Sequence, residues 1–183
     1  DVVVCRFGDG DVHVVPTEAD TIDVSVTYRA DVKGFGFGRD PDFETDIRRV
    51  DGRILIEGRE IPGGTTFVRV RSFKEYVYTI EAPPWVLLEL VGDDGDVEIE
   101  GWGAPIDIAL DDGDVTVARG DVQTLDLSFE DGDVTLSDVV GELSIVGDDG
   151  DDYSNIFDGV GDFGVNGNDK WNYRFNINLG YYF

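Results

Sequence analysis

The stretch that decides the fold is LDDGDVTV, residues Leu110–Val117, in which an acidic turn leads into an alternating apolar segment. Versions of the same unit recur before and after it, at Asp93–Val97, Glu130–Val134 and Asp148–Asp151. The turn glycines of the four units are evenly spaced along the chain, and they are Gly95, Gly113, Gly132 and Gly150. A fixed period this short is typical of a solenoid, in which each repeat forms one coil.

Each repeat carries two short segments in which apolar residues occupy every second position. In the second repeat these are Val115–Val117 and Leu125–Phe129. This alternation predicts strands with one buried face. We therefore expect an all-β fold, a single-stranded β-solenoid or β-helix-like stack of coils that are each about 18–19 residues long. Two internal ladders should run through it, one of Val97, Val115 and Val134 and the other of Ile99, Val117 and Leu136.

The N-terminal half contains partial copies of the repeat, separated by insertions. Asp9–Val14 followed by Thr21–Val26 matches the register of the second repeat, and Asp51–Gly58 resembles Asp94–Gly101. No segment holds a helical period over three turns. We expect one solenoid domain, residues 1–183. Its parts are 1–90, N-terminal coils with insertions at Tyr28–Val50 and Ile61–Trp85; 91–152, the regular repeats; and 153–183, a C-terminal cap.

The C-terminal segment Trp171–Phe183 alternates apolar and polar residues without a break. A solenoid must cover its open ends, because an exposed edge invites pairing with another chain. The pattern therefore predicts a capping strand. The alternatives are a partner-binding edge, including a homo-oligomer formed through this strand, and a strand inserted into a membrane.

Charge limits the partners of this chain. Forty acidic residues against fourteen basic ones give a formal net charge of −26, which disfavours nucleic acids and anionic membrane surfaces. Ten of the basic residues lie between Arg29 and Lys74, whereas Arg119 is the only one between Glu81 and Asp169. No apolar run is long enough to predict a transmembrane segment. The single cysteine, Cys5, is expected to be a small buried apolar residue.

The acidic turns have two interpretations. Asp-Gly suits tight corners because glycine adopts positive φ freely, so the repeat needs no ligand. Alternatively, stacked carboxylates could attract cations, either diffusely or as a specific Ca²⁺ site. The candidate cation ladder consists of Asp94, Asp96, Asp112, Asp114, Asp131, Asp133, Asp149 and Asp151. Neither the nine-residue calcium repeat nor an EF-hand loop is present, and no catalytic constellation or cofactor motif is found.

The Gly-Asp-Val coils, together with the entry Pro84–Leu90, resemble a bacterial β-solenoid family of unknown function whose members are called putative adhesins. The resemblance implies export to the envelope or surface and a binding or structural role, with a signal peptide removed from the mature chain. It supplies no catalytic residues. We therefore expect a non-enzymatic adhesin-like or scaffold module that contacts an envelope or surface component, protein or glycan. The alternatives are a carbohydrate-active β-helix enzyme and a calcium-binding structural solenoid.

Overall fold

A computed structural model describes residues 1–36, 42–61, 66–147 and 171–177, and all regular secondary structure in these ranges is β. Twelve strands form one sheet with both parallel and antiparallel neighbours. In chain order they are β1 (Val2–Gly8), β2 (Asp11–Pro16), β3 (Asp23–Gly36), β4 (Asp42–Val50), β5 (Arg53–Ile61), β6 (Thr66–Ala82), β7 (Leu87–Asp94), β8 (Val97–Glu100), β9 (Ile106–Asp112), β10 (Val115–Phe129), β11 (Val134–Gly147) and β12 (Trp171–Ile177).

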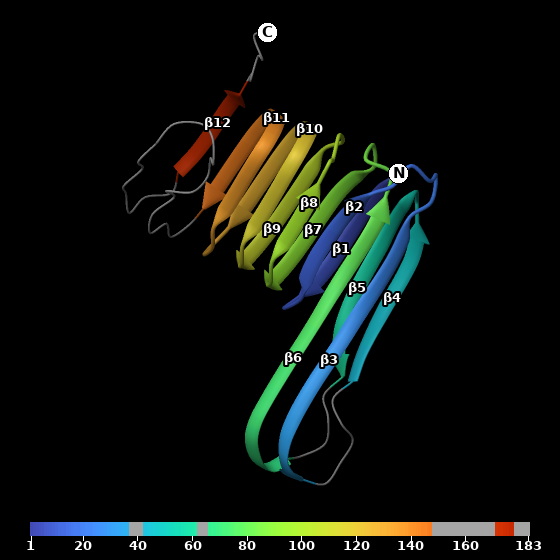
Figure 1. Ribbon diagram of the computed structural model, residues 1–183, viewed down its shortest axis with the longest axis vertical. Coiled ribbons are helices and arrows are strands. Elements are labelled where there is room, and N and C mark those ends of the chain that lie inside the picture. The colour runs from blue at the N-terminus through green and yellow to red at the C-terminus, as the bar shows by residue number, and fades with distance from the viewer. Residues whose placement is uncertain (37–41, 62–65, 148–170, 178–183) are drawn as a thin grey trace.

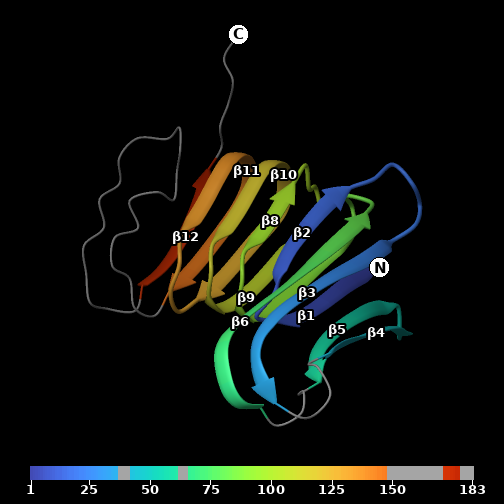
Figure 2. The same ribbon diagram turned by 60° about the horizontal axis from the view of Figure 1, so that its bottom comes forward.

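The sheet turns back on itself to form two layers. The first part of β10 pairs with β8 and the second part with β9, so β10 belongs to both layers. One layer therefore holds β6, β2 and β8, and the other holds β5, β1, β7 and β9 (Figures 1 and 2). The chain changes layer within β10 near Arg119, whose φ is 53°. Both layers turn apolar side chains inward, and the core lies between them.

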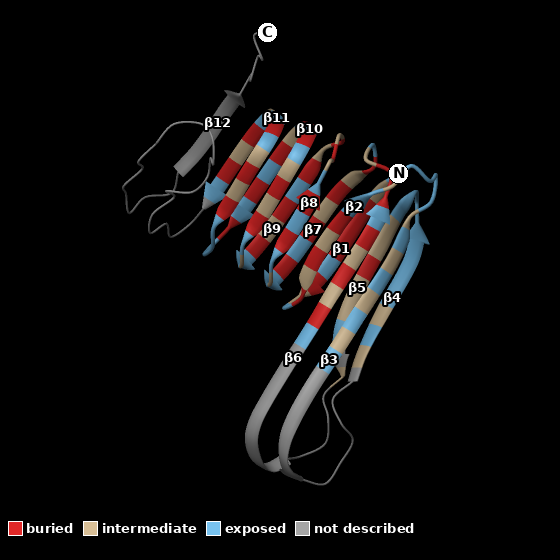
Figure 3. Ribbon diagram, in the orientation of Figure 1, coloured by how far each residue is buried: buried red, intermediate tan, exposed pale blue. Residues whose placement is uncertain are grey.

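The two predicted ladders are confirmed. Val115 pairs in parallel with both Val97 and Val134, and Val117 pairs with both Ile99 and Leu136. All six side chains are buried. β2 adds one further rung, because Val12 pairs with Val97 and Val14 with Ile99. Along these strands buried residues alternate with intermediate or exposed ones, as Figure 3 shows.

The opposite layer contributes a matching apolar row to the core. Leu88, Ile106, Leu125 and Leu143 occupy successive register positions and are each at most 1% exposed. Trp102 fills the corner between β8 and β9, where its side chain is fully buried and its Nε1–H donates to the carbonyl oxygen of Val86 at 3.0 Å. A buried indole N–H that finds an acceptor avoids the cost of an unpaired donor.

The N-terminal half departs from the expected coils. β3 pairs antiparallel with β6, and β4 pairs antiparallel with β5, so the two predicted insertions belong to nested hairpins. The interpretation of Thr21–Val26 as a coil strand is wrong, because Asp23–Val26 pairs antiparallel with β6. Asp51–Gly52 is likewise a two-residue hairpin turn: its φ values of 49° and 80° are both positive, as a type I′ turn requires.

The predicted all-β class is confirmed, and the sheet is mixed because β3, β4 and β12 pair antiparallel with their neighbours. β12 lies along the Gly141–Gly147 part of β11, so the alternating segment does form a strand over Trp171–Ile177. The remainder of the tail, residues 178–183, lies outside the described residues. The division into N-terminal coils, repeats and cap stays a prediction.

Candidate functional site: the acidic turn edge

The Asp-Gly turns of successive repeats lie directly over one another along one edge of the sheet. The turn glycines Gly95, Gly113 and Gly132 have φ values of 148°, 132° and 138°. A Cβ atom on Gly113 would lie 2.2 Å from the carbonyl oxygen of Gly95, and one on Gly132 would lie 2.0 Å from that of Gly113. Glycine is therefore required both by conformation and by the close approach of neighbouring backbones.

The aspartate after each turn glycine binds the next turn. The amide N–H of Asp96 donates to Oδ1 of Asp11 at 3.1 Å, and that of Asp114 donates to Oδ1 of Asp96 at 3.1 Å. The amide of Asp133 donates to Oδ1 of Asp114 at 2.9 Å. Charge-assisted bonds of this kind are stronger than neutral ones. Turn chemistry thus accounts for the carboxylates of Asp11, Asp96 and Asp114. Together with Asp133, which contributes the last amide, we call these residues the aspartate ladder.

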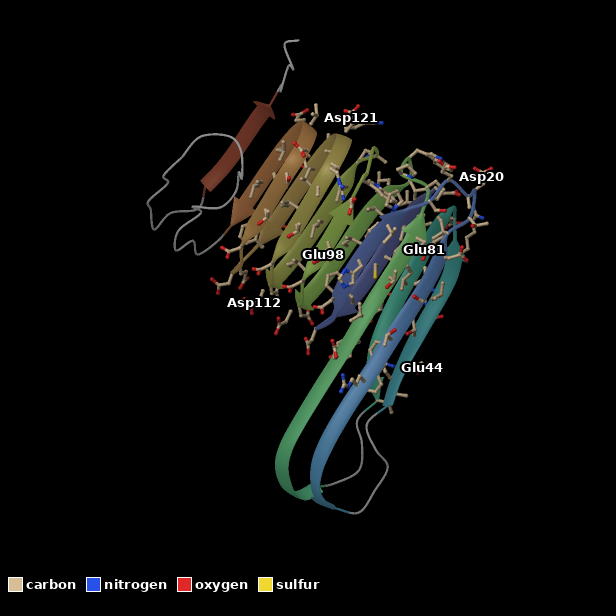
Figure 4. All side chains as sticks on the ribbon, in the orientation of Figure 1. Asp20, Glu44, Glu81, Glu98, Asp112 and Asp121 are labelled. Carbon is tan, nitrogen blue, oxygen red and sulfur yellow. The ribbon has the colours of Figure 1, made fainter. Side chains whose placement is uncertain are left out.

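The aspartates before the glycines form a second row. Asp94 pairs with Asp112 in the β7–β9 register, and Asp112 forms a backbone bridge with Asp131. The three residues are exposed, and side chains with acidic ends gather along this edge around Asp112 (Figure 4). Among the described residues, no group of three His, Cys, Asp or Glu is arranged to hold a metal ion. Asp149 and Asp151 lie outside the described residues, and cation binding stays a prediction.

The outer face of the second layer carries a column of acids that the turn motif did not reveal. Glu89, Asp107 and Asp126 occupy adjacent register positions on β7, β9 and β10. Partial desolvation raises the pKa of Asp107, and the charges of Asp126 and Glu89 raise it further, although its side chain remains exposed. Arg53 forms an ion pair with Glu89 at one end of the column. The repeat itself could have found this column, because each member follows the previous one by a single repeat period.

The single cysteine, Cys5, and the single histidine, His13, could form a catalytic pair only with each other, and they lie in different layers. Cys5 faces the core, is fully buried, and has its pKa raised to about 12 by that burial. His13 lies on the outer face of the other layer, where its Nδ1 is 2.8 Å from Oε2 of Glu98. The thiolate needed for nucleophilic attack is therefore not populated at neutral pH.

Comparisons with known proteins assign this chain to no family. No protein-family model and no curated protein sequence matches the chain. One solved structure that it resembles is described as a "putative cell adhesion protein" from Clostridium sporogenes, with a TM-score of 0.44, 13% identity and 74% of this chain covered. The match spans 65% of that structure's length. No helix within the described ranges has the length and apolar character needed to cross a membrane.

Proposed function

We propose that the chain is an exported β-solenoid module, without enzymatic activity or a cofactor, that serves as an adhesin-like or scaffold component of the cell envelope or surface. The supporting observation is the in-register stacking of β2, β8, β10 and β11, together with the aspartate ladder that ties their turns. Strands that are stacked in register in this way give a rigid body with extended outer faces. Repeat proteins commonly use such surfaces to bind partners.

The outer surfaces indicate what kind of contact would suit this body. Asp126 and Asp107 stand on a layer that presents exposed side chains in regular rows. With a net charge of −26, the chain attracts cationic groups and repels anionic ones over the Debye length of about 10 Å in 0.1 M salt. We propose a surface protein or glycan that offers basic groups or many hydroxyl groups as the partner.

A binding panel of purified envelope fractions, polysaccharides and cationic peptides would test this function. The double variant Asp107→Asn with Asp126→Asn removes two charges from the column of acids on the outer face. The matched control, Asp20→Asn with Asp121→Asn, removes two charges from the edge that lies opposite the acidic turns. We expect a ligand whose affinity falls at least about tenfold in the first variant only, which corresponds to about 1.4 kcal/mol. Turnover of any polysaccharide, abolished by one carboxylate substitution, would overturn the proposal.

A carbohydrate-active enzyme is the competing candidate, and Asp107 is the observation that favours it. Acid-base hydrolysis of a glycosidic bond needs two carboxylates in different environments. Asp107 has a raised pKa and lies beside Asp126 in the register. If the chain is such an enzyme, Asp107→Asn and Asp126→Asn should each abolish turnover. If the chain is a binding module, no form of it should turn over a polysaccharide.

A further inference from the structure

The antiparallel pair of β3 and β6 extends beyond the body of the protein at the acidic turn edge. β6 pairs with β2 only over Val77–Ala82, and Val77 lies opposite Asp11, the first residue of β2. The preceding part of β6 and its partner in β3 therefore continue past the Asp-Gly turns as a two-stranded ribbon, as Figure 1 shows. We call the segments Arg29–Gly36 and Thr66–Glu75 the arm.

The arm has the opposite charge to the edge from which it projects. It carries five basic residues, Arg29, Lys33, Arg69, Arg71 and Lys74, against the two acids Asp31 and Glu75. The turn edge has acidic residues at every corner, and the one basic residue between Asp93 and Asp133 is Arg119, where β10 changes layer away from the turns. A positive arm and a negative edge lie on the same side of one molecule.

Within the arm, two basic residues occupy opposed positions of the backbone register. The β3–β6 register pairs Lys33 with Arg71. Like charges at directly opposed positions destabilise a strand pair by roughly 0.2–1 kcal/mol, and a two-stranded ribbon is only marginally stable by itself. Carboxylates placed across this pair would remove the repulsion and stabilise the ribbon. We therefore expect the arm to bind an acidic surface.

We propose that two copies of this chain associate edge to edge, with the arm of each lying along the acidic turn edge of the other. Both surfaces lie on one side of the molecule, so a two-fold axis satisfies both contacts at once. Such a self-complementary arrangement closes as a dimer. The contact differs from association through the C-terminal strand, because it uses neither β11 nor β12.

Reciprocal charge reversal tests the dimer. The arm variant Lys33→Glu with Arg71→Glu replaces one like-charge pair by another, so the repulsion within its ribbon matches that of the wild-type chain. The edge variant Asp111→Lys with Glu130→Lys reverses two exposed neighbours whose backbones are joined by a hydrogen bond from the Glu130 amide to the Asp111 carbonyl at 3.0 Å. The control variant Asp20→Lys with Asp121→Lys makes the same charge change at the opposite edge (Figure 4).

Sedimentation velocity should show a dimer of the wild-type and control chains at low salt. The dimer's dissociation constant should rise at least about tenfold between roughly 0.05 and 0.5 M NaCl, because screening shortens the reach of exposed charges. The arm and edge variants should each be monomeric, and their equimolar mixture should restore a heterodimer in which both contacts are attractive. A monomeric wild type, a dimer indifferent to the arm and edge reversals, or a mixture that stays monomeric would overturn the proposal.

Discussion

Substituting Gly113 by alanine tests whether the close stacking of the turns holds the repeats together. Its φ of 132° is strained for a residue with a side chain, at a cost of about 1–3 kcal/mol. The added Cβ would also lie 2.2 Å from the carbonyl oxygen of Gly95, so the two backbones must separate. Separation weakens the two bonds that join these turns, from the Gly95 amide to the Asp112 carbonyl oxygen at 3.3 Å and from the Asp114 amide to Oδ1 of Asp96 at 3.1 Å, each with a net contribution of about 0.5–1.5 kcal/mol.

The expected loss of unfolding free energy for Gly113→Ala is therefore about 2–6 kcal/mol. In a chain of this size that loss lowers Tm by about 4–24 °C, which differential scanning calorimetry measures directly. Gly103→Ala is the matched control, because its nearest neighbour is an ordinary 3.5 Å away and its φ lies outside the left-handed region. Gly8→Ala separates the two causes: its φ is 58° but its surroundings are open, so it should cost only about 1–2 kcal/mol. If Gly113→Ala melts within a degree or so of Gly103→Ala, the stacking argument is refuted.

Four further outcomes are expected. Asp114→Ala should lower unfolding free energy by about 1 kcal/mol more than Asp114→Asn, because asparagine keeps an oxygen for the Asp133 amide; equal losses in urea titrations would contradict the aspartate ladder. The raised pKa of Asp107 means that the folded state holds its proton more tightly than the unfolded state, so this group's contribution to stability is lost as pH rises. Asp107→Asn should therefore raise Tm at pH 7, and the gain should vanish at low pH, where Asp107 is protonated. A difference in Tm that does not depend on pH would refute the raised pKa as its cause. Tm should rise with NaCl and level off, with Ca²⁺ adding little beyond its ionic strength, whereas a large shift at sub-millimolar Ca²⁺ would establish a specific site. Deleting Trp171–Phe183 should lower Tm or cause aggregation, because β12 covers the Gly141–Gly147 edge of β11; a monomer with unchanged Tm would argue against capping.

Residues that repeat at a short, fixed spacing were predictable because their structure depends on local chemistry and on identical neighbours. The alternation in Val115–Val117 determines which side chains face the core, and the repeat period determines which valine lies above which. The parallel ladders follow from these two facts, and the positive φ of the turn glycines follows from the Asp-Gly pair at each corner. The structural role of Asp114 was only half visible, since the sequence identified the turn but not the neighbouring amide whose hydrogen bond its carboxylate accepts.

The tertiary structure alone decided how identical dipeptides are used. Asp51-Gly52 and Asp94-Gly95 read alike in the sequence, yet the first closes an antiparallel hairpin with φ values of 49° and 80°, and the second is a corner between β7 and β8, which lie in different layers, with a glycine φ of 148°. The difference depends on which strand lies beside each segment, and this pairing is non-local: β5 runs next to β1, whereas β8 runs between β2 and β10. Local sequence therefore specifies a turn and a buried face. The competition among distant strands for the same sheet edges determines the direction of each strand and the layer to which it belongs. It also determines which strands extend beyond the body as the arm.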